Sequence, residues 1–176
     1  MPTETLERPS AEYISDAEWL ASRRTTTFPA QAILSAEPPI RLIGSPMGGF
    51  ILTVGDASPP WIKPAVRGLS ALLELPSDWD SYGGVRIKPE IVIAALNLLF
   101  ETMQYDSPAP SIVPTSRGGI QLEWHRNGVD LEVEFVSPSR VRGVFEDRQN
   151  GDTWDRDLFY DLGPLTKAIA ELSHNR

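Results

Sequence analysis

Residues 118–135, GGIQLEWHRNGVDLEVEF, decide the fold of this chain. Asn127-Gly128 is typical of a two-residue type I′ hairpin turn, because both of its positions require a positive φ angle. With this turn in place Trp124 lies opposite Leu131, and along the whole hairpin apolar residues pair with apolar residues and polar with polar. A shift of one residue would destroy that match, so the pattern predicts the register as well as the hairpin.

Turn signals divide the rest of the chain into short strands and three helical segments. Apolar residues recur at helical spacing in residues 61–75 and from Lys88 to Thr102, and a last helix is expected at 165–172. The expected strands are 40–43, 50–54, 111–114, 119–125, 129–136, 140–147 and 153–158. The short connections after residue 110 predict an α+β fold: an antiparallel β-meander of four to five strands with helices packed on one face.

Residues 1–38 differ from the rest in being polar and proline-containing. We expect a mobile N-terminal arm there, in which residues 10–24 could form one short helix, and a single α+β domain at 39–176. A sharper alternative is that the arm is a partner-docking segment, because a short amphipathic helix with an exposed Trp19 is a common anchor.

Composition excludes several classes of function. The net charge of −8 and pI near 4.8 argue against general nucleic-acid binding, which depends on neutralising phosphates, and permit a basic protein partner. The chain has no cysteine and only two histidines, which excludes disulfides and thiolate ligands and disfavours a zinc site, so no metal or cofactor is expected. No stretch has the length of a membrane span or an apolar signal core, and a cytoplasmic protein is expected.

The polar face of the central hairpin is the first candidate site. It gathers Glu123, His125, Asp130 and Glu132, with the two glutamates directly opposite each other. These side chains could form a carboxylate pair for acid–base chemistry, with His125 oriented by Asp130, or a site for a hard cation. The alternative, which we favour, is a solvated charge ladder neutralised by an arginine of the next strand, Arg142 or Arg140 opposite Glu134.

The segment WDSYGG before the second helix is the other candidate site. Trp79, Asp80 and Tyr82 could line a pocket or form a contact surface. The structural alternative is that the two aromatic rings close the end of the core while Asp80 accepts hydrogen bonds from turn amides. The two interpretations are evenly balanced, and Asp80 is also an additional candidate for catalysis.

Five aspartates make a locally acidic tract that begins at the end of the sixth expected strand: Asp147, Asp152, Asp155, Asp157 and Asp161. Their spacing does not match a calcium-binding loop, which needs alternating oxygen ligands, a central glycine and a terminal glutamate. A solvated hairpin tip is therefore expected.

The segments WDSYGG, PSIVPTS and GGIQLEWH…GVDLEVEF together resemble a group of small bacterial proteins in which a Trp-Asp-x-Tyr-Gly segment precedes a Gly-Gly-x-x-Leu-Glu-Trp strand. The resemblance covers roughly residues 75–136. It implies a bacterial cytoplasmic protein with a self-contained fold. No activity, cofactor or catalytic residue comes with it.

Two functional hypotheses remain from the sequence. The first is a non-enzymatic protein-interaction module, the acidic partner or neutraliser of a basic protein in a bacterial defence, toxin–antitoxin or regulatory operon. The second is a small hydrolase-like or metal-dependent enzyme that uses the carboxylate face of the central hairpin together with Asp80. A sheet-based RNA binder is disfavoured by the charge.

Overall fold

The computed structural model describes residues 40–44, 50–54 and 58–173, with side chains described from residue 58 onward. The N-terminal arm expected at residues 1–38 lies outside the described residues. The division of the chain into an arm and one domain stays a prediction.

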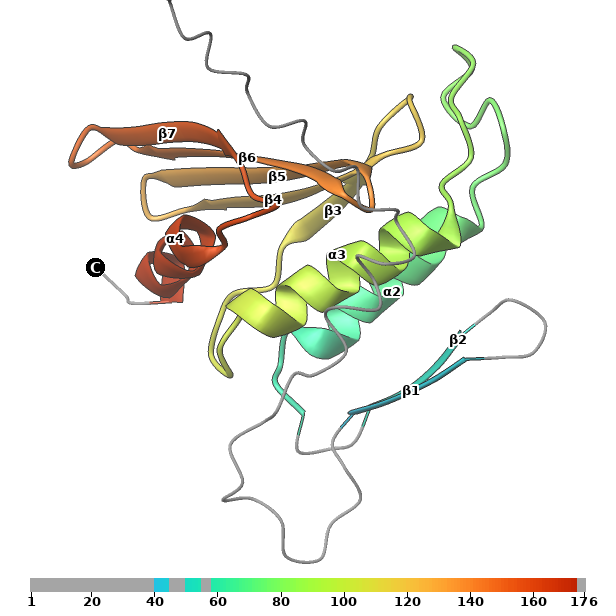
Figure 1. Cartoon of the computed structure of the whole chain (residues 1–176), viewed down its shortest axis with the longest axis horizontal. Coiled ribbons are helices and arrows are strands. Elements are labelled where there is room, and N and C mark those ends of the chain that lie inside the picture. The colour runs from blue at the N-terminus through green and yellow to red at the C-terminus, as the bar shows by residue number, and fades with distance from the viewer. Residues whose placement is uncertain (1–39, 45–49, 55–57, 174–176) are drawn as a thin grey trace, which may run out of the picture.

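A five-stranded antiparallel sheet forms the centre of the fold (Figure 1). Its strands pair in chain order, as the short connections predicted. They are β3 (Ser111–Pro114), β4 (Ile120–Arg126), β5 (Val129–Ser137), β6 (Arg140–Asp147) and β7 (Asp152–Asp157). The α+β fold and the antiparallel meander are therefore confirmed.

The register of the central hairpin agrees with the prediction at every pair. Trp124 lies opposite Leu131, and the pairing continues from Arg126 with Val129 to Ile120 with Phe135. The turn has positive φ angles at Asn127 (55°) and Gly128 (79°), as a type I′ turn requires.

Three helices and a separate hairpin complete the described structure (Figure 1). The helices are α2 (Ile62–Leu73), α3 (Pro89–Thr102) and α4 (Gly163–Ser173), and the hairpin joins β1 (Ile40–Gly44) and β2 (Phe50–Val54). Helix α3 contacts β4 and β5 and lies beside α2, which also contacts β3. The finer expectation, that the helices pack on one face of the sheet, stays a prediction.

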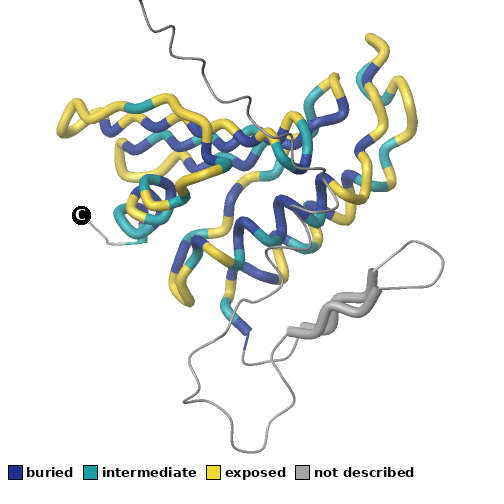
Figure 2. Tube along the Cα trace, viewed as in Figure 1, coloured by how far each residue is buried: buried dark blue, intermediate teal, exposed yellow. Residues whose placement is uncertain are grey.

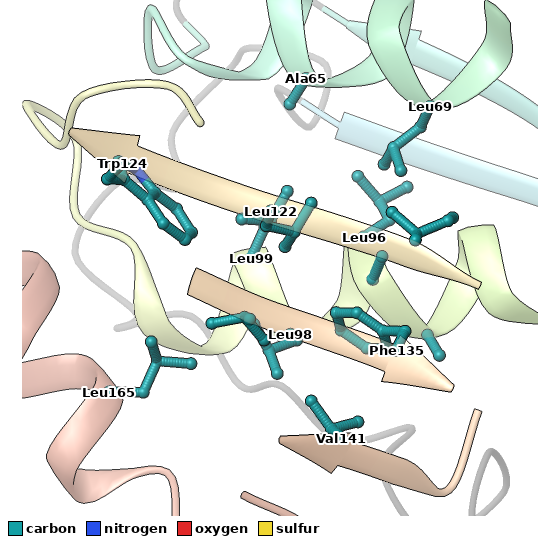
Figure 3. Packing of buried hydrophobic residues seen from close by; sticks show 14 of the residues in the cluster. Ala65, Leu69, Leu96, Leu98, Leu99, Leu122, Trp124, Phe135, Val141 and Leu165 are labelled. Carbon is teal, nitrogen blue, oxygen red and sulfur yellow. The ribbon is translucent and has the colours of Figure 1, made fainter. Parts of the chain in front are cut away.

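The core forms where the helices meet alternate residues of the strands. Figure 2 shows buried and less buried positions alternating along β4 and β5, which is the period of a strand with one covered face. Figure 3 shows Leu122 and Phe135 of these strands next to Leu98 and Leu99 of α3. Helix α3 begins with Pro89 in its first turn, as expected, and supplies more buried residues than the other helices described.

Gly68 is a poor helix former in the middle of α2, and the close contact with β3 explains its presence there. A Cβ atom at this position would lie 3.1 Å from Cδ1 of Ile112 in β3. The glycine costs the helix about 1 kcal/mol relative to alanine, and in return α2 approaches β3 closely.

Asp147 corrects the expectation of a solvated aspartate-rich hairpin tip. Its side chain is only 1% exposed, whereas the other four aspartates of that tract are exposed. One carboxylate oxygen accepts the backbone N–H of Gln149 at 2.8 Å, and the other accepts the side-chain amide of Asn150 at 2.9 Å. The buried carboxylate of Asp147 thus stabilises the β6–β7 turn by accepting hydrogen bonds from residues of that turn.

Among the helices of the described segments, none combines the length and the apolar character that crossing a membrane would require.

Trp124 is the residue on which we test the hairpin register. Its side chain is 3% exposed, and its indole N–H donates to the backbone oxygen of Pro108 at 2.8 Å. We expect Trp124→Ala to lower the free energy of unfolding by about 3–5 kcal/mol, because it leaves a large cavity and an unpaired carbonyl. Denaturant unfolding followed by circular dichroism measures the loss. Trp124→Phe, which retains most of the buried ring, should cost less. An unchanged denaturation midpoint in Trp124→Ala would show that Trp124 is not a core residue.

Candidate functional site

Residues 78–84, between α2 and α3, form a loop that is held by its own carboxylates; we call it the Tyr82 loop. Oδ1 of Asp80 accepts the backbone N–H groups of Tyr82 at 2.9 Å and Gly84 at 2.8 Å. Asp78 closes the loop with a backbone hydrogen bond to the oxygen of Gly84 at 2.7 Å, while its carboxylate accepts the N–H of Gly83. These are the turn contacts that the structural interpretation of Asp80 predicted.

The backbone of the Tyr82 loop is strained, and the carboxylate contacts maintain that strain. Asp78 and Ser81 have φ angles of 63° and 61°, in the left-handed region that residues with a Cβ seldom adopt. Gly83 also has a positive φ, of 88°. Such a conformation persists only when surrounding contacts determine it, and here these are the hydrogen bonds to the carboxylates of Asp78 and Asp80.

The two aromatic rings of the loop have different environments. The Tyr82 side chain is 93% exposed. Trp79 is half-buried, and its indole N–H is buried without a hydrogen-bond acceptor among the described residues. A Cβ atom at Gly84 would lie 2.7 Å from that nitrogen, so Trp79 needs the glycine beneath it. Trp79 packs against the loop, and Tyr82 projects from it.

Contacts with the turn between β3 and β4 fix the position of the loop (Figure 1). The Ser116 side chain hydrogen-bonds the Asp80 carboxylate, and the Ser116 backbone oxygen accepts the N–H of Val85 at 2.9 Å. The Ser116 hydroxyl, followed by the Tyr82 N–H, lowers the pKa of Asp80 below its usual value. A carboxylate with a lowered pKa is a weak base, which argues against Asp80 as a general base.

The carboxylate face of the central hairpin is a network of charged pairs. Nδ1 of His125 lies 2.7 Å from Oδ1 of Asp130, and its Nε2 lies 3.6 Å from Oε2 of Glu123. The second distance is too long for a hydrogen bond and leaves a charge interaction when the ring is protonated. The hydrogen bond with Asp130, more than the interaction with Glu123, raises the pKa of His125 above 6.5. Arg148 adds an ion pair, with Nη2 at 2.5 Å from Oδ2 of Asp130.

The two opposed glutamates, Glu123 and Glu132, each have a different side-chain neighbour although they face each other in the sheet. Glu123 faces Glu132 across β4 and β5, as predicted. Glu132 accepts the side-chain amide of Gln121 at 2.8 Å, while Glu123 lies beside His125. Each carboxylate therefore has its own neighbour of favourable polarity.

The arginine expected to neutralise this face has a different partner. Arg142 does lie opposite Glu134 in the register of β5 and β6. Its guanidinium, however, makes a two-pronged ion pair with Asp155 of β7, through Nε and Nη2. This pair first, and then the field of Glu134, raises the pKa of Arg142, so Glu134 is its more distant neighbour.

The two candidate sites do not form one catalytic centre. Asp80 contacts the β3–β4 turn, whereas His125 lies near the β4–β5 turn at the other end of β4, roughly 17 Å away at 3.3 Å per residue. No cluster of three or more His, Asp or Glu side chains in the part of the chain that the structure describes could hold a metal ion. The His125–Asp130 pair could transfer a proton, but half of the His125 side chain is exposed to water.

The structure adds residues that sequence reasoning missed. Two hollows, of about 420 and 380 Å³, lie at the end of the sheet beside the Tyr82 loop, and both are lined by Arg117 and Val136. The predicted strand order could have indicated that these residues lie together. Alternate turns of a meander fall at the same end of the sheet, so the basic residues near turns 115–119 and 137–139 had to gather there.

Comparison of the chain with family models, with curated proteins and with solved structures yields no match. The site is therefore interpreted from its own geometry.

We predict that His125 titrates above an ordinary histidine and that Asp130 is the main cause. A pKa raised in the folded state stabilises the fold fully below the unfolded value near 6.5, and this contribution is lost as the pH rises through the folded-state pKa. Titration of the imidazole signals by NMR should show a lower pKa for His125 in Asp130→Asn, and a smaller decrease in Glu123→Gln. An unchanged pKa in Asp130→Asn would contradict the assigned pair.

A second prediction concerns the metal-dependent alternative. A specific metal site would raise the melting temperature by mass action. We expect no such site, and therefore no change of the melting temperature in millimolar Mg²⁺, Mn²⁺ or Ca²⁺. Differential scanning fluorimetry of the parent and of Glu123→Gln makes the comparison. A saturable rise in the parent that Glu123→Gln abolishes would favour the enzyme over the interaction module.

Proposed function

We propose that this chain is a non-enzymatic protein-interaction module that binds its partner through the Tyr82 loop. The observation that carries the proposal is a tyrosine ring 93% exposed on a loop whose backbone is fixed by carboxylate and backbone hydrogen bonds. A solvent-facing ring contributes little to the stability of the fold, so its contribution is to recognition.

The fixed loop makes Tyr82 an efficient anchor. Tyrosine buries a large area at the loss of few side-chain torsions, and single anchor residues often contribute 2 kcal/mol or more to a protein interface. Ordering a mobile loop would reduce that gain. Here the Asp80 carboxylate accepts the backbone N–H groups of Tyr82 and Gly84, so the binding step has little loop backbone left to order.

The charge and the cysteine content of the chain support a biological setting for this module. A net charge of −8 supports association with a basic protein, as in a bacterial defence, toxin–antitoxin or regulatory operon. A chain without cysteine fits the reducing cytoplasm.

A second candidate function is acid–base catalysis on the carboxylate face. The observation that favours it is the 2.7 Å contact of His125 with Asp130, which would orient the ring as a proton-transfer group. Neither of the two hollows beside the Tyr82 loop is lined by His125.

Tyr82→Ala tests the proposal. We expect the variant to lose the partner while retaining the melting temperature of the parent, because the ring is exposed. The tagged full-length protein is expressed in its native host, and the proteins that co-purify are compared by mass spectrometry. Thermal unfolding of the same preparations separates lost binding from lost stability.

Tyr105→Ala is the matched control. Tyr105 is also exposed, at 63%, and it follows α3, whereas Tyr82 precedes it, which separates the two by about 21 Å along the helix. This variant should retain the partner. A Tyr82→Ala protein that captures the same proteins as the parent, whatever its stability, would reject the Tyr82 loop as the binding surface.

A further inference from the structure

The two hollows beside the Tyr82 loop adjoin each other at the end of the sheet. The larger lies over the ends of β5, β6 and β7, and the smaller reaches to the start of α3. Arg117 and Val136 line both, so the hollows form one continuous surface. Val85, the residue that follows the Tyr82 loop, lines the smaller one.

Basic side chains predominate around this surface, against the balance of the whole chain. Six cationic side chains line the two hollows, together with four carboxylates. The cationic residues are Arg86, Lys88, Arg117, Arg140, Arg142 and Arg156. A local excess of positive charge in a chain with a net charge of −8 is a property of this site, and the average composition does not explain it.

Four of these cations have no counter-ion among the residues that the structure describes. Arg142 is paired with Asp155, and the guanidinium of Arg156 lies over the Trp154 ring at 5.4 Å. Arg86, Lys88, Arg117 and Arg140 make no ion pair with any of the residues that the structure describes. Like charges gathered without partners repel one another, and an anionic ligand would remove that cost.

Apolar groups accompany the unpaired cations. Val85 is 50% exposed and Val136 is 38% exposed, and both line the smaller hollow. Tyr82 projects from the adjacent loop. A ligand that fits this surface carries carboxylates for the arginines and apolar side chains for the valines, which is the chemistry of an acidic peptide.

We propose that this arginine-lined surface binds an acidic, partly apolar peptide segment of the partner protein, a proposal that rests on the proposed function of the Tyr82 loop. Arginine binds carboxylates through two parallel N–H groups, as Arg142 and Asp155 do on the same surface. Nucleic acid is the poorer occupant, because a run of phosphates offers nothing apolar to the exposed side chains of Val85 and Val136, which also line this surface.

The probe is a short capped peptide in which glutamate alternates with leucine, added to the ¹⁵N-labelled full chain and followed by two-dimensional NMR. The amide signals of Arg117, Val136 and Arg140 should shift saturably. In Arg117→Glu, and separately in Arg140→Glu, the dissociation constant should rise by about tenfold or more, because each variant replaces an attraction by a repulsion. Signal dispersion in the same spectra shows whether each variant is folded.

Three comparisons decide the outcome. Arg67→Glu makes the same charge change on an exposed position of α2 outside both hollows, and it should bind the acidic peptide as the parent does. The proposal is overturned if the acidic peptide does not shift these amides. It is equally overturned if a lysine–leucine peptide or a short single-stranded oligonucleotide shifts them as strongly, or if both arginine variants bind like the parent.

The result is independent of the test of the proposed function, because the probe is added without the partner. A negative peptide titration together with loss of the partner in Tyr82→Ala rejects the acidic segment and leaves the module in place. Peptide binding together with unchanged capture in Tyr82→Ala rejects the role of the Tyr82 loop and leaves the acidic ligand.

Discussion

The register of β4 on β5 is the constraint on which the rest of the structure depends. Because side chains alternate between the two faces of a sheet, one register sends Ile120, Leu122 and Trp124 into the core and leaves Glu123 and His125 on the polar face. The Asn127-Gly128 turn enforces that choice, since both of its residues adopt positive φ. The short turn into β6 transmits it onward, with one irregularity between Phe135 and Ser137.

Local patterns predicted this part of the fold because its determinants lie close together in sequence. The hairpin and helix α3 follow from periodicity and turn residues, which also left Arg142 and Arg140 as the two candidates opposite Glu134. The bond from Arg142 to Asp155 does not, because the choice between two carboxylates depends on where β7 is placed. The burial of Asp147 could have been predicted from the strand period. Asp147 lies six residues after Val141, and since side chains alternate along a strand, both point to the inward face of β6. An aspartate there is stable only because the β6–β7 turn supplies its donors.

The candidate site was predictable only to the extent that it is local. The hydrogen bonds of Asp80 to the amides of Tyr82 and Gly84 follow from the spacing of a glycine-rich turn. The bond between Asp80 and Ser116 joins segments far apart in sequence, and no periodicity reports it. That contact attaches the Tyr82 loop to the β3–β4 turn, whose residue Arg117 lines both hollows. The arrangement that suggests recognition is thus a tertiary property.

Net charge and local charge act at different distances, and this separates two features of the partner. The −8 of the whole chain influences how molecules approach, whereas at physiological salt a bound group senses mainly the charges within about 8 Å. A partner that is basic overall would therefore be attracted toward the chain, while the proposed surface beside the Tyr82 loop would bind an acidic segment of it. A uniformly acidic protein would be repelled before it reached Arg117, and a uniformly basic one would meet unpaired cations there. The two hypotheses about charge, basic partner and acidic ligand, are compatible when the acidic segment belongs to a basic protein.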